Sequence, residues 1–211
     1  MKTRGNLIVL SGFAGVGKGT VLKSLFETHE GYAYSVSATT RDPRPGEVEG
    51  VHYFFISKER FEEMIRNDEL LEYASYVGNY YGTPKAYVDR KLEDGFDVIL
   101  EIEAQGALKI KKKLPDAVLI FMLPPCAKTL KERLTGRGTE TEDVIRKRLR
   151  RAAEEAVEAE KYDYIIVNDD VDECAQRLNS LIRSQRLRTN SNLAFMRALQ
   201  KDLTKLTQEG E

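Results

Sequence analysis

The feature that most constrains this chain is a glycine-rich loop between a short apolar run and a helical pattern. Residues 7–10 read LIVL, and residues 11–20 read SGFAGVGKGT. Glycines allow a tight loop whose backbone N–H groups converge on a phosphate, and the N-terminus of the following helix adds partial positive charge. Lys18 can reach the β- and γ-phosphates of a nucleotide, and the hydroxyl of Thr20 can ligate Mg²⁺. The sequence therefore predicts a nucleotide phosphate site here.

We expect nine consecutive residues to form this site: Gly12, Phe13, Ala14, Gly15, Val16, Gly17, Lys18, Gly19 and Thr20. The match to the general pattern G-x4-G-K-[ST] is incomplete, because Gly19 stands where the hydroxyl residue belongs and Thr20 follows one place later. An ordinary glycine turn is the alternative. The lysine, the threonine and the strand–loop–helix context together favour phosphate binding.

Short apolar runs alternate with helical patterns along most of the chain. The runs 7–10, 98–102, 118–123 and 164–167 are nearly continuous in apolar residues, which is typical of strands buried on both faces of a parallel sheet. Helices are predicted at about 18–29, 84–94, 104–113, 129–135 and 142–161. This alternation favours an α/β fold, with a parallel sheet flanked by helices.

One internal segment departs from this rhythm. Residues 38–82 are rich in Tyr, Phe, Gly and Pro, with strand-like pieces at 53–56 and 71–77. We interpret the segment as an inserted small lobe of mixed α/β structure. Residues 1–37 and 83–190 then form the core, in which Thr83 is expected to cap a helix that starts at Pro84 and stops at Gly95.

The last residues, 191–211, are predicted to form an additional helix. Met196, Leu199, Leu203 and Leu206 recur at spacings of three and four, which gives one apolar face. Ser191 or Asn192 is the expected cap. We expect the apolar face to pack within the chain, while a subunit contact stays open as the alternative.

Composition excludes several classes of protein. The 33 basic and 34 acidic residues leave a formal charge of −1, so the basic excess of a nucleic-acid-binding or membrane-surface protein is missing. The two cysteines, Cys126 and Cys174, have no disulfide or zinc-ligand spacing, and no apolar run is long enough for a signal peptide or a membrane span. We therefore expect a cytoplasmic protein with no nucleic-acid or membrane partner; monomer and homo-oligomer both stay open.

Two carboxylates lie at the end of the apolar run 98–102 and just beyond it. Glu101 and Glu103 are two residues apart, and alternation along a strand would place them on the same side. Ligands bind at the carboxyl ends of the strands in open α/β sheets, so Glu101 is a candidate to hold a water on Mg²⁺. Two solvated carboxylates at a strand end are the alternative, which the nearby phosphate loop disfavours.

A second candidate anion site lies in the inserted segment. Arg41 and Arg44 stand three residues apart in a proline-containing loop, and the forked guanidinium group suits the oxygens of a monophosphate. The hydroxyl groups of Tyr53 and Tyr81 can add hydrogen bonds. Taken alone, such arginines usually form a solvated face and such tyrosines usually pack.

Five motifs in order, with the phosphate loop, resemble the guanylate kinase family. They are SVSATTR followed by PRPGE, GNYYGTP, EIEAQGA, GRGTE and IVNDD, and the resemblance covers about residues 5–183. It implies a P-loop nucleoside monophosphate kinase that transfers the γ-phosphoryl group of ATP to GMP or dGMP, with Mg²⁺. By the same resemblance, the GMP phosphate is bound by Arg41, Arg44, Tyr53 and Tyr81, and guanine by Ser37, Glu72, Thr83 and Glu103.

The chemistry of guanine fits that assignment. A carboxylate such as Glu72 can accept hydrogen bonds from the N1–H and the 2-amino group of guanine. Adenine lacks this pair of donors and would leave a buried charge unpaired, so discrimination against AMP can be large. A kinase for another monophosphate such as AMP, a non-catalytic module of the same fold and a P-loop hydrolase remain the alternatives.

The resemblance also assigns the donor side of the site. Arg133 and Arg137 would belong to a mobile lid at about 129–150, and Arg148 would reach the reacting phosphates. The catalytic set is then Lys18, Arg41, Arg133, Arg137 and Arg148. Asn168 and Asp169 match a position near the adenine ring. The other basic residues of this segment, Arg146, Arg150 and Arg151, are expected to be solvated.

This sequence departs from the family pattern at four places. Phe13-Ala14 replaces a frequent Pro-Ser, Gly19 leaves the metal hydroxyl to Thr20, and Glu103 replaces a more usual Asp. The fourth departure is the extra helix beyond about residue 186. Transfer itself needs no general base, because the attacking phosphate oxygen is already anionic; it needs in-line positioning, charge neutralisation and exclusion of water.

Overall fold

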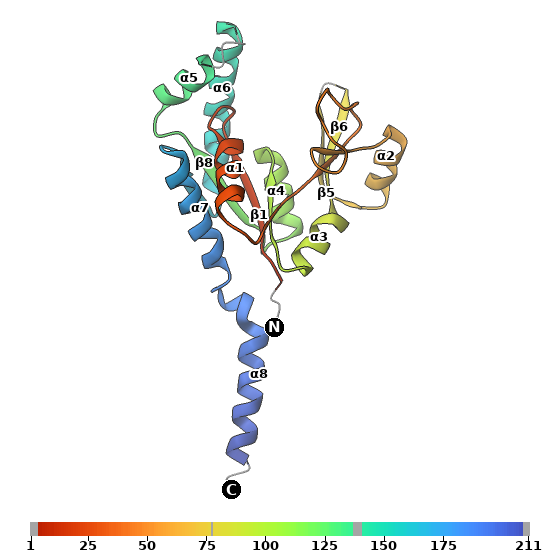
Figure 1. Cartoon of the computed structure of the whole chain (residues 1–211), viewed down its shortest axis with the longest axis vertical. Helices are drawn as coiled ribbons and strands as arrows, with labels where there is room; N and C mark the ends of the chain where they lie inside the picture. Colours follow the sequence, from red (N-terminus) through yellow and green to blue (C-terminus); the bar gives the residue numbers. More distant parts are fainter. Residues whose placement is uncertain (1–3, 77, 137–140, 209–211) are drawn as a thin grey trace.

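The central sheet of the protein consists of parallel strands, as seen in a computed structural model that describes residues 4–76, 78–136 and 141–208 (Figure 1). Five strands lie in the order β2 (Tyr32–Tyr34), β7 (Asp97–Glu101), β1 (Leu7–Gly12), β8 (Val118–Leu123) and β9 (Tyr164–Val167). All neighbours in this sheet pair in parallel. The prediction of an α/β fold with a parallel sheet is confirmed.

Strand β1 illustrates why the apolar runs became central strands. Its side chains alternate between two apolar cores: Ile8 and Leu10 belong to one, and Leu7 and Val9 to the other. All four are buried. A strand that is apolar on both faces is stable only between two layers, so the sequence itself requires helices on each side of the sheet.

Helices cover both faces of this sheet. Helices α1 (Lys18–Thr28) and α7 (Val171–Gln185) contribute Leu25 and Leu178 to the core that contains Ile8, while α3 (Lys85–Glu93) and α4 (Ala104–Lys113) contribute Leu92 and Ile110 to the other. Helix α3 stops as expected, since Gly95 follows it with a φ of 88° and its N–H donates to the Leu92 carbonyl.

Helix α5 (Ala127–Thr135) and helix α6 (Glu142–Glu158), which ends in a 3₁₀ turn at Ala159–Lys161, follow strand β8. Leu134 of α5 and Ile145 of α6 pack against the same core as Ile8. In Figure 1 both helices rise beyond the upper edge of the sheet. They span the segment expected to form the lid.

The inserted segment forms a second, smaller sheet. Its strands lie in the order β4 (Tyr53–Phe55), β3 (Ser37–Thr39), β6 (Asn79–Pro84) and β5 (Leu70–Tyr76), and helix α2 (Lys58–Arg66) lies between β4 and β5 in the sequence. Strand β3 pairs in parallel with β4 and antiparallel with β6, which is also antiparallel to β5.

This smaller sheet has a core of its own. Ala38, Phe61, Met64 and Leu70 are buried together, and the Phe61 ring stacks on Tyr80 with centroids 5.1 Å apart. A separate core gives the segment its own packing, so it can keep its internal structure if it moves relative to the larger sheet. In Figure 1 it lies on the opposite side of α4 from α5 and α6.

Two local expectations are wrong. Pro84 is the last residue of β6 and the N-cap of α3, so the helix starts at Lys85. Thr83 is fully buried in β6, where it bonds to Glu72 rather than capping a helix. The sequence analysis also did not identify strand β2 or helix α7.

The C-terminal helix α8 (Thr189–Gln208) forms, but it does not pack on the core. None of its residues is buried, and Met196, Leu199, Leu203 and Leu206 are exposed. Figure 1 shows it extending away from the rest of the molecule. The expected caps are also wrong: the Ser191 and Asn192 side chains donate to carbonyls behind them, at Gln185, Arg186 and Arg188. Within the described ranges, no helix combines the length and the apolar character needed to cross a membrane.

Candidate active site

The glycine-rich loop connects strand β1 to helix α1, as the motif predicts. Gly15 and Gly17 have φ values of 83° and 96°, which only glycine adopts without strain. A Cβ on Gly17 would also lie 2.6 Å from the Asn168 amide nitrogen. The Lys18 ammonium donates to the carbonyls of Gly12 and Phe13, at 2.7 and 3.3 Å. The lysine therefore lies across the mouth of the loop, where a phosphate can attract it.

Two side chains, those of Arg133 and Asn168, donate hydrogen bonds to the backbone of this loop. Arg133 of α5 donates to the carbonyls of Val16 and Asn168, both at 3.0 Å. The buried Asn168 amide also donates to Val16, at 2.8 Å. Both groups were expected at the nucleotide, Arg133 at its phosphates and Asn168 near its adenine ring. In the structure they hold the backbone that forms the phosphate site. The buried side-chain oxygen of Asn168, Oδ1, has no hydrogen-bond partner among the described residues.

The remaining predicted donor residues are spread around the loop. Asp169 is exposed and forms an ion pair with Arg177 of α7. Thr20 is exposed on the first turn of α1, and Arg148 is partly buried on α6. Arg137 lies outside the described residues. Helix α5 ends at Thr135, so the expectation that Arg133 and Arg137 share one helix face depends on residues beyond that helix.

A cavity of about 370 Å³ lies between the smaller sheet and the end of strand β7. It gathers most of the residues predicted for the acceptor side of the site. Its lining includes Ser37, Tyr53, Glu72, Tyr81, Glu101 and Glu103. Residues that are up to 66 positions apart in the sequence, from Ser37 to Glu103, therefore meet in one cavity.

Glu72 is the partly buried acid of this cavity. Thr83 donates its hydroxyl to the Glu72 carboxylate at 2.8 Å, which orients the carboxylate. Burial raises the pKa of Glu72, with Glu103 adding to the rise, and the Thr83 hydrogen bond and Lys109 oppose it. The carboxylate is thus destabilised when ionised and unoccupied, so a ligand that donates hydrogen bonds to it is favoured.

Gly106 of α4 makes room for this carboxylate. A Cβ at this position would lie 3.1 Å from a Glu72 carboxylate oxygen and 3.3 Å from the Ile102 side chain. The glycine therefore permits α4 to approach the cavity closely. Gly106 belongs to the EIEAQGA motif, but nothing in the sequence pattern indicated this role for it.

Arg41 is fixed beside the same cavity. Its guanidinium group binds Glu47 through two hydrogen bonds of 2.9 and 3.0 Å, and it lies 5.5 Å from the centre of the Tyr53 ring. The Arg41 guanidinium lowers the pKa of Glu47 to about 2. Glu47 also accepts the backbone N–H of Arg44, whose side chain is exposed. Glu47 was not among the predicted site residues, although it is the last residue of the PRPGE motif.

The two carboxylates at the end of β7 and just beyond it differ in their local structure. Glu101 is the last residue of β7, is partly buried and accepts a hydrogen bond from the Tyr34 hydroxyl at 3.3 Å. Glu103 lies beyond the strand, as the N-cap of α4, so the expected strand alternation does not relate the two. Both nevertheless line the acceptor cavity.

The protein itself offers two candidate oxygen ligands for Mg²⁺. The Thr20 hydroxyl and the Glu101 carboxylate are hard oxygen ligands of the type that Mg²⁺ prefers, and phosphate oxygens and water can complete its octahedron. The described residues contain no group of three or more His, Cys, Asp or Glu that could hold a metal.

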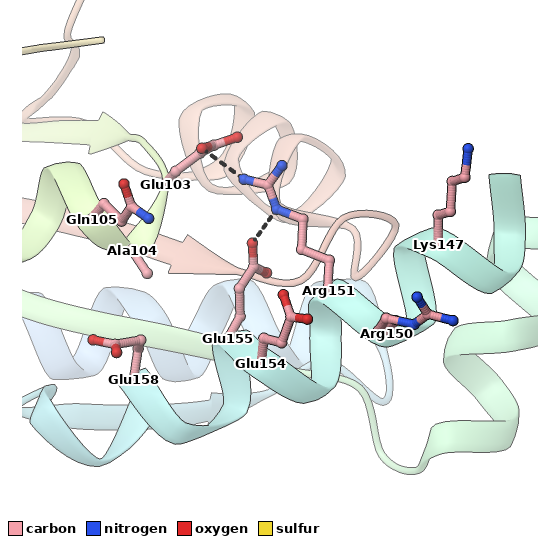
Figure 2. Close-up of a pocket in the computed structure, with 9 residues that line it drawn as sticks. All are labelled: Glu103, Ala104, Gln105, Lys147, Arg150, Arg151, Glu154, Glu155 and Glu158. Atoms are coloured by element: carbon pink, nitrogen blue, oxygen red, sulfur yellow. Dashed lines mark hydrogen bonds and ion pairs between the residues drawn. The ribbon is translucent and has the colours of Figure 1, made fainter.

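One residue expected to be solvated is part of the site. Arg151 of α6 bonds to Glu103 at 2.8 Å and to Glu155 at 2.9 Å (Figure 2). It also lines the acceptor cavity. Arg151 is exposed, as are Arg146 and Arg150, so all three are solvated as expected; Arg151 differs in also forming these two contacts. No local signal identifies this contact, since Arg151 and Glu103 are 48 residues apart.

Comparison with known proteins agrees with this arrangement. The family model described as guanylate kinase matches residues 4–185. The chain is 54% identical over 203 residues to the guanylate kinase of Streptococcus thermophilus CNRZ 1066, covering 96% of this chain and 97% of that protein. It is 55% identical over 186 residues to that of Streptococcus pneumoniae R6, covering 88% and 89%.

A solved structure has the same fold. The guanylate kinase of Anaplasma phagocytophilum superposes with a TM-score of 0.69 at 35% identity, over 89% of each chain. The family match, the identities over most of the chain and this superposition agree with the loop and the cavity described above. The chain belongs to the guanylate kinase family.

Proposed function

We propose that this protein transfers the γ-phosphoryl group of ATP to GMP, or dGMP, in a reversible reaction that gives ADP and GDP. One observation carries the choice of acceptor. The partly buried Glu72, oriented by Thr83, faces a cavity whose walls also carry Ser37, Tyr81 and Glu103. The names of the relatives support the same activity.

The acceptor base is selected by hydrogen bonding to Glu72. The N1–H and the 2-amino group of guanine donate to the carboxylate, while Thr83 keeps the carboxylate in place and Ser37 and Glu103 contact the base edge. AMP lacks this pair of donors, so its binding leaves a partly buried charge unsatisfied. Family membership alone does not fix these residue roles; the geometry of the cavity supports them.

The acceptor phosphate is held near the part of the cavity lined by Tyr53 and Tyr81. Arg41, Arg44, Tyr53 and Tyr81 are the ligands that we propose. The ion pair with Glu47 holds Arg41 in one orientation before a phosphate arrives, which reduces the conformational entropy lost on binding. Two further bonds to a phosphate are available to a guanidinium that has five N–H donors.

The donor is held by the glycine-rich loop. Its backbone from Gly12 to Thr20 surrounds the β- and γ-phosphates, and Lys18 moves from the loop carbonyls to the phosphate oxygens. Arg133, Arg137 and Arg148 complete the positive charge around the transferred group, and Asn168 and Asp169 lie toward the adenine. Mg²⁺, held with the nucleotide by Thr20 and Glu101, neutralises phosphate charge when bound.

We propose a division of labour that follows the two sheets. Residues 38–82 are the acceptor lobe, residues 129–150 the lid, and residues 1–37 and 83–190 the core that holds ATP. Closure of lobe and lid would exclude water and so prevent ATP hydrolysis.

The two cysteines, both free, and the nucleotide substrates favour the cytoplasm as the place of action.

The test is a comparison of acceptors with wild type and a Glu72→Gln variant. ADP formation is measured with ATP, Mg²⁺ and each of GMP, AMP, CMP and UMP. We expect turnover with GMP, and a fall in kcat/KM for GMP of about 100-fold in the variant, since an amide donates where guanine also donates. The same change at the exposed Glu93, in Glu93→Gln, is the control and should leave kcat/KM unchanged.

The opposite results are equally clear. Turnover that prefers AMP would overturn the choice of acceptor while leaving the kinase fold in place. Equal kcat/KM values for wild type and Glu72→Gln would remove Glu72 from base recognition. A protein that binds ATP but phosphorylates none of the four acceptors would be a non-catalytic member of the family.

A further inference from the structure

Helix α6 contributes a side chain to the acceptor cavity. A second cavity, of about 570 Å³, lies between α6 and the start of α4, and it is lined by Glu103, Gln105, Lys147, Arg150, Arg151 and four further residues (Figure 2). Glu103, Gln105 and Arg151 line both this cavity and the acceptor cavity. These three residues form the boundary between the acceptor site and the proposed lid.

Arg151 bridges two carboxylates across this boundary. Its Nη2 atom donates to Glu103 at 2.8 Å, and its Nε atom donates to Glu155 at 2.9 Å. Figure 2 shows the guanidinium group between the two acids, while Arg150 and Lys147 point away from them. Glu155 lies one turn further along α6 and is only 20% exposed, so it anchors the guanidinium to its own helix.

Glu103 has little support from its own element. It is the N-cap of α4, yet its side chain makes no capping hydrogen bond, and that side chain is 75% exposed. A glutamate side chain in this position would otherwise sample many rotamers, and a long flexible acid recognises a base poorly. The bond from Arg151 restricts the Glu103 carboxylate to one region at the mouth of the acceptor cavity.

The same guanidinium offsets a repulsion within the cavity. Glu103 contributes to raising the pKa of Glu72, which shows that the two carboxylates influence one another. The positive charge of Arg151 beside Glu103 reduces this mutual repulsion.

Arg151 stands three residues after Arg148 on the same helix. Positions three apart lie on one side of a helix, so the arginine proposed to reach the reacting phosphates and the arginine that holds Glu103 move as one rigid body. A shift of α6 therefore changes both contacts together.

We propose that Arg151 is a positioning residue for acceptor specificity: it holds Glu103 against the guanine edge of the acceptor from the lid helix. This inference rests on the proposed phosphorylation of GMP. It gives Arg151 a role through Glu103 and no direct contact with either substrate. Base recognition then depends on the position of α6 as well as on the acceptor lobe.

The experiment is a double-mutant cycle on Arg151 and Glu103. Wild type, Arg151→Ala, Glu103→Gln and the double variant are compared in KM for GMP, KM for ATP, and GMP binding by calorimetry. We expect Arg151→Ala to raise KM and Kd for GMP about fivefold and to leave KM for ATP unchanged. In the Glu103→Gln background, removing Arg151 should add less than about twofold.

Two controls separate this effect from a change in folding or surface charge. Arg150→Ala removes an exposed arginine of the same helix that points away from Glu103, and it should leave KM for GMP unchanged. Arg151→Gln keeps most of the side-chain length without the charge and should behave as Arg151→Ala does. Thermal unfolding of all variants should coincide within about 2 °C, because exposed ion pairs add little stability.

Each outcome decides between the claims. If wild type turns over GMP and Arg151→Ala has the same KM for GMP as Arg150→Ala, the role of Arg151 is overturned while the proposed function stands. An Arg151→Ala effect that persists undiminished in the Glu103→Gln background would also overturn it, because the effect would not pass through Glu103. Absence of GMP turnover in wild type would overturn the proposed function and this inference with it.

Discussion

At Gly106 the needs of helix α4 and of the acceptor cavity oppose each other. Alanine is favoured over glycine within a helix by about 1 kcal/mol. The added methyl group would lie 3.1 Å from the Glu72 carboxylate, however, so the carboxylate has to move by a few tenths of an ångström. Glycine at this position therefore leaves room for the Glu72 carboxylate but lowers the stability of helix α4.

We expect Gly106→Ala to separate stability from acceptor binding. The free energy of unfolding should stay the same or rise by up to about 1 kcal/mol, whereas KM for GMP should rise about fivefold. KM for ATP should not change, since Gly106 is remote from the phosphate loop in sequence and lines the acceptor cavity. Denaturant unfolding and steady-state kinetics on one preparation measure both. A lower stability with an unchanged KM for GMP would contradict this account.

The pKa of Glu72 leads to a prediction about pH. Because burial raises this pKa above its ordinary value of 4.5, the carboxylate gains a proton at a higher pH than an exposed glutamate does. The proton occupies an oxygen that should accept a guanine N–H, so binding weakens as the pH falls.

KM for GMP should therefore rise as the pH is lowered from neutrality, and it should rise more steeply for wild type than for Glu72→Gln. The GMP phosphate has a second pKa of about 6, but its protonation affects KM for wild type and for Glu72→Gln alike. Initial rates over a pH series in constant ionic strength give the comparison. Parallel curves for the two proteins would show that Glu72 does not titrate in this range.

At the scale of elements, helix α8 behaves differently from the others. Every described residue from Phe195 to Gln208 is exposed, including the large apolar side chains of its stripe. Burial of apolar side chains is what stabilises most helices in proteins, and α8 lacks it in the single chain. The start of the helix is different, because Ser191 and Asn192 bond to the end of α7.

A chain that ends at Ala194 should therefore fold as stably as the full chain. We expect its Tm to lie within about 2 °C of the full-length value and its kcat and KM values to be unchanged, since no core contact is lost. Differential scanning calorimetry and the coupled kinase assay check this. A fall in Tm of more than about 5 °C would mean that α8 buries its apolar stripe in solution.

The elements that could be predicted are those whose periodicity is strong. Strands β8 and β9 and helix α4 have the bounds expected from sequence, because each is a continuous apolar run or a clear helical pattern. Helix α7 escaped notice because its buried face includes the polar Asn179 and Gln185, which interrupt the apolar stripe. Strand β2 is only three residues long and is partly exposed.

In the candidate site, residues within contiguous motifs could be predicted, whereas contacts between distant segments could not. The loop, Glu72 and Arg41 belong to contiguous motifs, so resemblance identified them. The supporting contacts are formed between distant segments: Arg133 with the loop, and Arg151 with Glu103. Such pairs depend on how the helices pack, which no local spacing encodes.

At the scale of the whole molecule, an ion pair between the partly exposed Arg186 and the buried Asp97 connects the C-terminal end of the core to the central sheet. Asp97 at the start of β7 is 3% exposed, and it accepts two bonds from Arg186, at 3.0 and 3.2 Å. It also accepts the backbone and side-chain N–H groups of Asn6, at 2.8 and 2.9 Å. The start of the chain, the sheet and the end of α7 are joined at this acid.

Arg186→Ala should destabilise the protein by about 2 kcal/mol, because the substitution leaves a buried carboxylate with only its Asn6 donors. For a chain of this size, the corresponding fall in Tm is about 4–8 °C. The exposed Arg188, changed in Arg188→Ala, is the matched control and should alter Tm by less than about 2 °C. Equal Tm values for the two variants would show that the pair adds nothing to stability.

The central claim is that the γ-phosphoryl group of ATP moves to GMP rather than to water or to another acceptor. The most direct measurement incubates the protein with Mg²⁺, ATP labelled in its γ-phosphate and an equimolar mixture of GMP, AMP, CMP and UMP, and separates the labelled products by chromatography. We predict label in GDP, with little in inorganic phosphate. Label in ADP, or in inorganic phosphate alone, would contradict the account.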